Sequence, residues 1–292
     1  MNIKTYRGEA ILFIVTLIAA SGWFFSKYSI AEFPPLGFIG LRFSVAALLF
    51  LPFAYPQLKQ LSKQQIIRAT AVGLCYTFYL TLWLLGLLNS RHFGEGAFLV
   101  SLSMLIAPLL SWLFFKQAPH KLFRLSLPAA ALGLYLLSYK PGGLSLSLGS
   151  LIFLSSSLSA AIYFILNNKF ARNIPILSLT TIQIGVVGLC CSLYSLCFES
   201  WSQPISAQAW LWFAASVLIA TNLRMLLQTM GQKYCDVTNG AIIMILEPVW
   251  TLMLSVLILH ETLSVYKLAG CALILLALII YRLPWLRTKT DR

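Results

Sequence analysis

Ten long apolar runs follow one another along the 292-residue chain, and they constrain its fold more than any other feature. They cover approximately residues 9–29, 34–55, 66–88, 95–115, 122–139, 148–167, 175–198, 207–230, 238–259 and 265–284. A helix needs about 20 mostly apolar residues to cross a bilayer, so each run has roughly the length of one span. The composition, with 59% hydrophobic and 10% charged residues, is also that of a membrane protein. We therefore predict an all-α integral membrane protein with ten transmembrane helices, the first being a retained helix and not a cleaved signal peptide.

The positive charges are distributed unevenly among the breaks between these runs. The formal net charge is +13, from 21 Lys and Arg against 8 Asp and Glu. If the N-terminus is cytoplasmic, 15 of the basic residues fall on the cytoplasmic side and 4 on the opposite side, while Arg42 and Arg224 lie inside runs. Cytoplasmic loops are enriched in Lys and Arg, so this split predicts a multi-pass protein of a bacterial-type inner (plasma) membrane with both termini cytoplasmic. Because the charges lie in loops and no aromatic-basic motif accompanies them, we expect no nucleic-acid partner.

The sequence lacks the usual signatures of enzymes and channels. It contains no HExxH, GxSxG, P-loop or GxGxxG motif, and its six cysteines show no CxxC or Cys/His metal spacing. A filter-like loop or a ring of charges, which are typical of channels, is also missing from the short breaks. We therefore expect a protein that is not an enzyme and that uses neither a cofactor nor a metal.

The two halves of the chain resemble each other weakly. Matching residues recur at a spacing of about 140, or 144 in the last case: Trp23 with Tyr163, Arg42 with Gln183, Pro108 with Pro248, and Gly96 with Gly240. This pattern predicts two five-helix repeats, residues 1–140 and 141–292. Because five is odd, the second repeat must enter the membrane in the opposite sense. Inverted repeats of this kind are typical of carriers that work by alternating access.

Two stretches resemble a known family, the drug/metabolite transporters of the EamA type. The run GAIIMILEPVWTLMLSVLILHETLS (Gly240 to Ser264) resembles the ninth helix of these transporters, and Leu85 to Phe115 is similar to the matching stretch of the first repeat. Gly22-Trp23 and Arg42 resemble the first two helices, whereas Lys116-Gln117 stands where many relatives have a Glu. The resemblance extends over essentially the whole chain and implies a secondary carrier of amino acids, other small metabolites or drugs.

Glu247 is the acidic residue that the sequence singles out. It lies about ten residues from either end of its predicted span and therefore near the bilayer midplane. A carboxylate there is unfavourable unless it is paired, protonated or facing a wet cavity. Two roles are open, a proton relay or a structural hydrogen-bonding partner beside Pro248. Arg224, in the preceding span, is long enough either to pair with Glu247 or to reach the cytoplasmic interface.

Aromatic, neutral polar and proline residues inside the runs complete the set of candidates. Tyr76, Tyr79 and Trp83 share one helix face, where they either stack on a substrate or pack against other helices. Neutral polar residues in spans form hydrogen bonds between helices. A proline frees the carbonyl one turn earlier, either for a substrate or simply at a kink. The candidates for substrate binding or translocation are Glu247, Trp23, Tyr76, Tyr79, Trp83, Ser103, Tyr163, Asn167 and Asn222. The candidates for gating or structural roles are Arg42, Pro108, Gln183, Arg224 and Pro248.

Together these features predict a secondary transporter of small metabolites such as amino acids or related compounds, working as an exporter by alternating access. Uptake of a nucleoside derivative or quaternary amine is an alternative within transport. A membrane interaction protein that transports nothing is the alternative outside it. The expected partners are a small-molecule substrate, membrane lipid and a coupling proton, with the chain acting as a monomer or homodimer.

Overall fold

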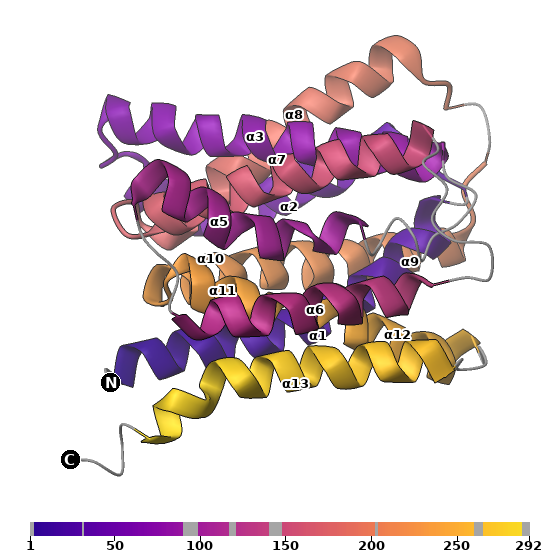
Figure 1. The fold of residues 1–292 in the computed structure, drawn as a ribbon. Coiled ribbons are helices and arrows are strands. Elements are labelled where there is room, and N and C mark those ends of the chain that lie inside the picture. Colours follow the sequence, from indigo (N-terminus) through magenta and orange to yellow (C-terminus); the bar gives the residue numbers. More distant parts are fainter. Residues whose placement is uncertain are drawn as a thin grey trace.

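The computed structural model describes residues 3–30, 32–89, 99–116, 121–139, 148–201, 204–259 and 265–287, and every regular element in these ranges is a helix. Figure 1 shows the helices as a layered bundle in which most of the helix axes are roughly parallel to one another. In chain order they are α1 (Ile3–Ile30), α2 (Pro35–Leu58), α3 (Lys63–Leu88), α5 (Ser103–Phe115), α6 (Lys121–Ser138), α7 (Leu148–Ala171), α8 (Ile176–Phe198), α9 (Ala207–Val217), η1 (Leu218–Leu223), α10 (Arg224–Tyr234), α11 (Val237–Met244), α12 (Glu247–Leu259) and α13 (Val265–Arg287).

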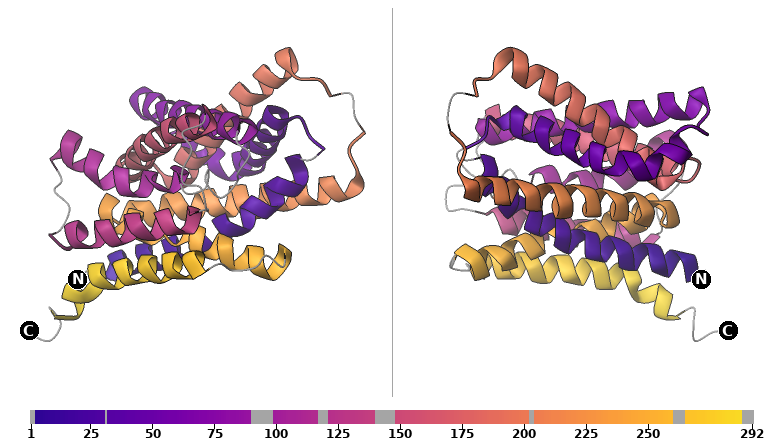
Figure 2. Two further views of the ribbon diagram at one scale, coloured as in Figure 1. Left: turned by 45° about the vertical axis from the view of Figure 1, so that its right-hand side comes forward. Right: turned by 180° about the vertical axis from the view of Figure 1, so that it is seen from behind.

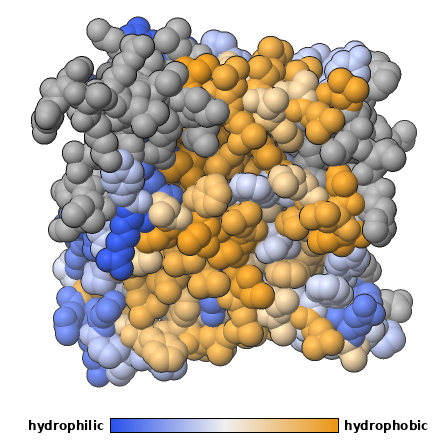
Figure 3. All heavy atoms as spheres, turned by 90° about the horizontal axis from the view of Figure 1, so that it is seen from below, coloured by the Kyte–Doolittle hydropathy of each residue, from blue (hydrophilic) through white to orange (hydrophobic). Residues whose placement is uncertain are grey.

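Among the described residues, seven helical segments are long and apolar enough to cross a membrane. Three shorter apolar helices, Leu99–Phe115, Ser126–Leu136 and Leu268–Ala277, accompany them. Figure 3 shows the corresponding surface: apolar residues cover the middle of the face, and hydrophilic residues gather toward its two edges. The all-α membrane fold is therefore confirmed, while the count of ten spans and their inverted order stay predictions.

Short polar sequences set several helix starts. Ser62 Oγ accepts a hydrogen bond from the Gln65 amide at 3.2 Å, and Gln65 Oε1 accepts one from the Ser62 amide at 2.9 Å. This reciprocal cap satisfies backbone donors that a helix start leaves unpaired. It explains why α3 begins at Lys63, three residues before the apolar run that predicts it. Asp236 caps α11 in a simpler way, by accepting from the Asn239 amide at 2.7 Å.

The helix pair α2 and α8 packs through small residues. A Cβ atom built on Gly40 would lie 2.5 Å from the Ser192 backbone nitrogen, and one on Gly188 would lie 2.5 Å from that of Ser44. The hydroxyls of Ser44 and Ser192 are 3.3 Å apart between these two contacts. Small residues allow two backbones to approach this closely, which is a common way of joining helices in membranes.

We expect Gly188→Ala to destabilise the protein by about 2 kcal/mol, because the added methyl group overpacks the backbone of α2. The thermal midpoint of the purified protein in detergent measures this effect. Gly185→Ala, in the same helix, is the control, since its Cβ would meet only Ala47 Cβ at 3.7 Å. Because Gly→Ala raises helix propensity at both positions, an equal loss for both variants would show that the close approach to α2 is not the cause.

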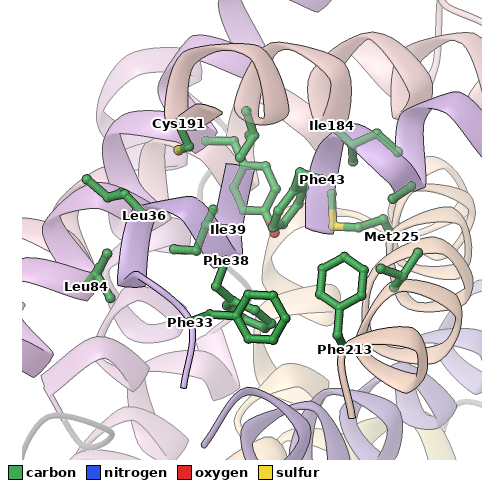
Figure 4. Packing of buried hydrophobic residues seen from close by; sticks show 14 of the residues in the cluster. Phe33, Leu36, Phe38, Ile39, Phe43, Leu84, Ile184, Cys191, Phe213 and Met225 are labelled. Carbon is green, nitrogen blue, oxygen red and sulfur yellow. The ribbon is translucent and has the colours of Figure 1, made fainter. Parts of the chain in front are cut away.

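A large apolar cluster fills the space between α2, α8 and the segment from α9 to α10. It contains buried aromatic and aliphatic side chains, among them Phe38, Phe43, Ile184, Phe213 and Met225. Figure 4 shows their side chains converging between these helices. Elsewhere α3 packs on α7, α1 on α10, and α6 on α13. The start of α1 and the end of α13 lie at the same end of the bundle in both views of Figure 2.

Two helical segments are interrupted by a turn, Val237–Ile258 near its middle and Leu99–Phe115 near the start of its described part. α11 ends at Met244, a turn occupies Ile245 and Leu246, and α12 begins at Glu247. Pro248 follows directly and has no backbone N–H to donate, which accounts for the break. In the first half, a turn at Leu102 precedes the start of α5 at Ser103, which is 144 residues before Glu247.

The interruptions place the two prolines differently. Pro108 lies inside α5 and leaves that helix unbroken, so it does not occupy the place that Pro248 has at the break. The spacing of 144 between the two helix starts equals the spacing of Gly96 and Gly240 in the sequence. Gly96 itself lies outside the described residues. The correspondence of the two halves, with Pro108 matched to Pro248, stays a prediction.

The segment Ala207–Tyr234 carries a third irregularity. Its middle part, η1, is π-helical, between the α-helical pieces α9 and α10. π-Helical turns are rare and are frequently found at functional sites. Here the irregular turn directly precedes Arg224 and thereby sets the direction of that side chain.

Candidate functional site

A charged and aromatic cluster forms where α1, α10 and α12 meet. Trp23 Nε1 donates a hydrogen bond to Glu247 Oε1 at 3.1 Å. Arg224 Nη2 lies 3.8 Å from Glu247 Oε2. The structure therefore contains the Arg224–Glu247 ion pair, one of the two arrangements that the sequence left open. The two side chains keep 24% and 20% of their surface exposed, so the pair is not sealed inside the protein.

The helix breaks place both charged residues. Glu247 is the first residue of α12, and Arg224 is the first residue of α10 after the π-helical turn. A carboxylate is favoured at a helix start because the partial positive charge of the helix dipole lies there. Trp23, in the last third of α1, reaches Glu247 because α1 packs against both α12 and α10.

Aromatic residues extend the cluster along α3. The Trp23 and Trp83 rings meet edge to face, with centroids 5.3 Å apart. Tyr79 lies four residues before Trp83 on α3, about one helical turn away and on the same face. Trp23, Tyr79 and Trp83 are all partly exposed, as are the two charged residues. We call these five residues, Trp23, Tyr79, Trp83, Arg224 and Glu247, the central site.

Tyr76 and Tyr163 lie behind this site and not on it. Their rings stack with centroids 4.4 Å apart, and only 3% and 4% of the two residues is exposed. Tyr163 also stacks more loosely on Tyr79, at 6.4 Å. The structure thus brings the three tyrosines together, as one column in which only Tyr79 is partly exposed.

Arg42 forms a second buried cationic position. Its Nε donates to Thr221 Oγ1 at 2.5 Å, and its Nη1 donates to Ser26 Oγ at 3.0 Å. The guanidinium also lies 5.7 Å and 5.6 Å from the ring centres of Phe38 and Phe43. Arg42 therefore ties α2 to α1 and to the π-helical turn. Thr221 and Ser26 were not among the residues predicted from the sequence, because no local pattern announces hydroxyl partners on other helices.

Asn167 and Gln183 belong to a separate polar network between α7, α8 and α10. Gln183 Nε2 donates to Asn167 Oδ1 at 3.3 Å and to Thr229 Oγ1 at 3.4 Å. Asn167 Nδ2 in turn donates to Gln232 Oε1. All four side chains are fully buried. Their arrangement is that of interhelical hydrogen bonding, which is the ordinary role of amides in membrane spans.

The remaining candidates lie near the breaks. Ser103 is 2% exposed at the start of α5, and Pro248 follows Glu247 in α12. Asn222 is 7% exposed in η1, and its Oδ1 has no hydrogen-bond partner among the described residues. Within the described ranges, no three His, Cys, Asp or Glu side chains are grouped so that they could hold a metal ion.

Comparison with known proteins finds relatives that are similar in sequence and a solved structure that is similar in fold. An uncharacterized transporter of Archaeoglobus fulgidus is 26% identical over 282 residues, covering 97% of this chain and 88% of the relative. The uncharacterized transporter YvbV of Bacillus subtilis is 24% identical over 281 residues, covering 93% and 90%. A solved crystal structure superposes with a TM-score of 0.80 over 96% of this chain and 98% of that chain. Its sequence is 17% identical, so this likeness concerns the fold alone.

The family comparison covers nearly the entire chain in two segments. The EamA-like transporter family matches residues 6–139 and again residues 147–283. The relatives of comparable length are transporters too, and the helical fold has the apolar segments that a membrane transporter needs. The chain belongs to the EamA-like transporter family.

Proposed function

We propose that this transporter is a secondary carrier that exports small metabolites, such as amino acids or related compounds, by alternating access. The observation that supports the proposal most is the central site. Its ion pair is partly exposed and is built from helices that are broken or π-helical at that point. In carriers, discontinuous helices of this kind surround the substrate site near the bilayer midplane.

Two inverted five-helix repeats, residues 1–140 and 141–292, are part of the same proposal. Three observations support it: the family matches the chain in two segments, the start of α1 and the end of α13 lie at one end of the bundle, and the helix interruptions are 144 residues apart. If two inverted halves exchange conformations, a site that opens to one side of the membrane becomes a site that opens to the other.

Glu247 supplies a way to couple transport to a proton gradient. While it is ionised, the carboxylate accepts from Trp23 and pairs with Arg224. Uptake of a proton removes its charge and releases Arg224 from the pair. We propose that this change alters how α10 and α12 hold each other, so that proton uptake and helix movement occur together.

Counterflow in proteoliposomes tests the carrier proposal. Vesicles loaded with an unlabelled metabolite should accumulate the same labelled metabolite transiently, because a carrier exchanges one molecule for another. Inside-out membrane vesicles and right-side-out cells then separate export from uptake. If no solute of a broad panel of amino acids, organic acids, nucleosides and amines is exchanged, the proposal is wrong, and an interaction protein becomes the better interpretation.

Cysteine labelling tests the proposed orientation in the inner membrane. Gln60 and Ser200 are both exposed, and they lie in breaks that the basic-residue split assigns to opposite sides. On a cysteine-free background, we expect a membrane-impermeant maleimide added to intact cells to label a cysteine at position 200 and not one at position 60. Labelling in lysed cells shows that both sites react. The reverse pattern in intact cells would place the termini outside.

A further inference from the structure

The interior charges around the central site do not balance. Two guanidinium groups, those of Arg42 and Arg224, accompany a single carboxylate, that of Glu247. Among the described residues, the only carboxylate oxygen within 4.0 Å of either guanidinium is that of Glu247 beside Arg224. One positive charge is therefore uncompensated inside the membrane span, where unpaired charges are rare and usually functional.

The two cations belong to one cluster. Thr221 accepts a hydrogen bond from Arg42 and lies three residues before Arg224 on the same helical segment. Ser26, the other hydroxyl that accepts from Arg42, lies three residues after Trp23 on α1. The surplus charge therefore acts at the central site, where the field of Arg42 adds to that of Arg224.

Arg224 also lacks hydrogen-bond acceptors. A guanidinium has five N–H donors. The Arg224 guanidinium forms no hydrogen bond with another described residue, since its 3.8 Å contact with Glu247 is longer than the 3.5 Å limit of a hydrogen bond. Its Nε atom is buried and has no hydrogen-bond partner among the described residues. Buried donors nearly always have an acceptor, so this group is suited to oxygens that a bound molecule brings.

Aromatic surface lies next to this donor group. Trp23 and Trp83 meet edge to face, and Tyr79 lies one helical turn before Trp83 on α3, all three being partly exposed. Rings in this position favour a planar or apolar body beside the charged end of a ligand. A small inorganic anion would leave these rings without a contact.

From this combination we infer that the transported substrate is an organic anion, with its carboxylate against Arg224 and a planar or apolar body against Trp23, Tyr79 and Trp83. The inference rests on the proposed carrier function and narrows its substrate to compounds related to amino acids that carry a net negative charge, such as 2-oxo acids or N-acylated amino acids. Arg224 contacts the carboxylate, and a guanidinium can bind both of its oxygens at once. Arg42 is a positioning residue that supplies the second positive charge from behind the site.

Three probes that share one phenylethyl body test the charge preference. They are 3-phenylpropionate, phenylalanine and phenethylamine, which are an anion, a zwitterion and a cation at neutral pH. Inorganic phosphate is the fourth probe. A bound ligand raises the thermal midpoint of the purified protein according to its concentration and Kd. We expect the midpoint to rise most with phenylpropionate, less with phenylalanine, and not with phenethylamine or phosphate.

Variants of Arg42 make the test independent of folding. Arg42→Gln removes the surplus charge, so the affinity for phenylpropionate should fall about tenfold and the preference should move toward phenylalanine. Arg42→Lys keeps the charge and should keep the preference for the anion. Arg68→Gln is the matched control, because Arg68 lies over the Phe170 ring and outside the central site. A variant that merely unfolds loses all ligands equally and cannot reverse a preference.

Several results would contradict the organic-anion inference. Equal stabilisation by all three ring compounds, a preference for the amine, or no effect of phenylpropionate would overturn the organic-anion inference. Phosphate acting as strongly as phenylpropionate would also overturn it, in favour of a simple anion site. Counterflow of a neutral or cationic solute would leave the carrier proposal standing while the anion inference fails.

Discussion

We expect Glu247→Gln to abolish accumulation driven by a pH gradient and to leave counterflow of the substrate intact. Gln cannot exchange a proton, but its side-chain oxygen can still accept the hydrogen bond from Trp23. One pH unit is worth about 1.4 kcal/mol, or about a tenfold concentration ratio for each coupled proton, and this ratio should fall to one in the variant. Labelled-substrate uptake into proteoliposomes, with and without an imposed gradient, measures both activities.

Two controls accompany this variant. Glu247→Asp keeps a titratable group and should retain part of the accumulation. Arg224→Gln combined with Glu247→Gln removes both charges, and it should regain any thermal stability that the single variant loses to an unpaired guanidinium. If Glu247→Gln folds normally and still accumulates substrate under a pH gradient, Glu247 has no part in coupling.

We expect Tyr163→Ala to lose mainly stability and Tyr79→Ala to lose mainly substrate affinity, although both remove a tyrosine from the same stacked column. Tyr163 is 4% exposed and stacked on Tyr76, so its loss leaves a cavity and should cost about 3–5 kcal/mol of stability. Tyr79 is partly exposed at the central site, so its loss should weaken substrate binding about tenfold with a smaller loss of stability. Thermal midpoints and counterflow half-saturation, measured on the same preparations, separate the two effects.

Tyr163→Phe is the conservative control, since the Tyr163 hydroxyl has no hydrogen-bond partner among the described residues. This variant should behave like the wild-type protein in both measurements. The assignment would be reversed if Tyr79→Ala lost more stability than Tyr163→Ala while substrate binding stayed unchanged.

The sequence predicts the membrane fold well because apolar run length is set by bilayer thickness and needs no tertiary information. It also predicts that Glu247 is unusual, since a carboxylate inside an apolar run stands out in one dimension. Its partner is harder to predict. The sequence indicates that the Arg224 side chain is long enough to reach Glu247. Only the packing of α10 against the other helices decides whether Arg224 pairs with Glu247 or extends to the membrane interface.

Other features depend on contacts that local patterns do not encode. Tyr76 and Tyr79 are three residues apart on one helix, yet Tyr76 is buried and Tyr79 is not, because α7 places Tyr163 over Tyr76. The hydroxyl partners of Arg42 come from two other helices. Pro108 and Pro248 look alike in sequence but differ in place, since only Pro248 coincides with a helix break.

The π-helical turn has a geometric consequence for the whole eighth apolar segment. Each residue of an α-helix advances by about 100°, so a turn that holds an extra residue rotates everything after it relative to everything before. α9 and α10 therefore present independent faces although they form one continuous rod. α9 can keep Phe213 in the large apolar cluster that it shares with α2 and α8, while α10 directs Arg224 toward Glu247. If η1 became a regular α-helix, Arg224 would point to another side of the helix, away from Glu247, although no side chain had changed. A change in helical pitch alone would therefore form or break the ion pair.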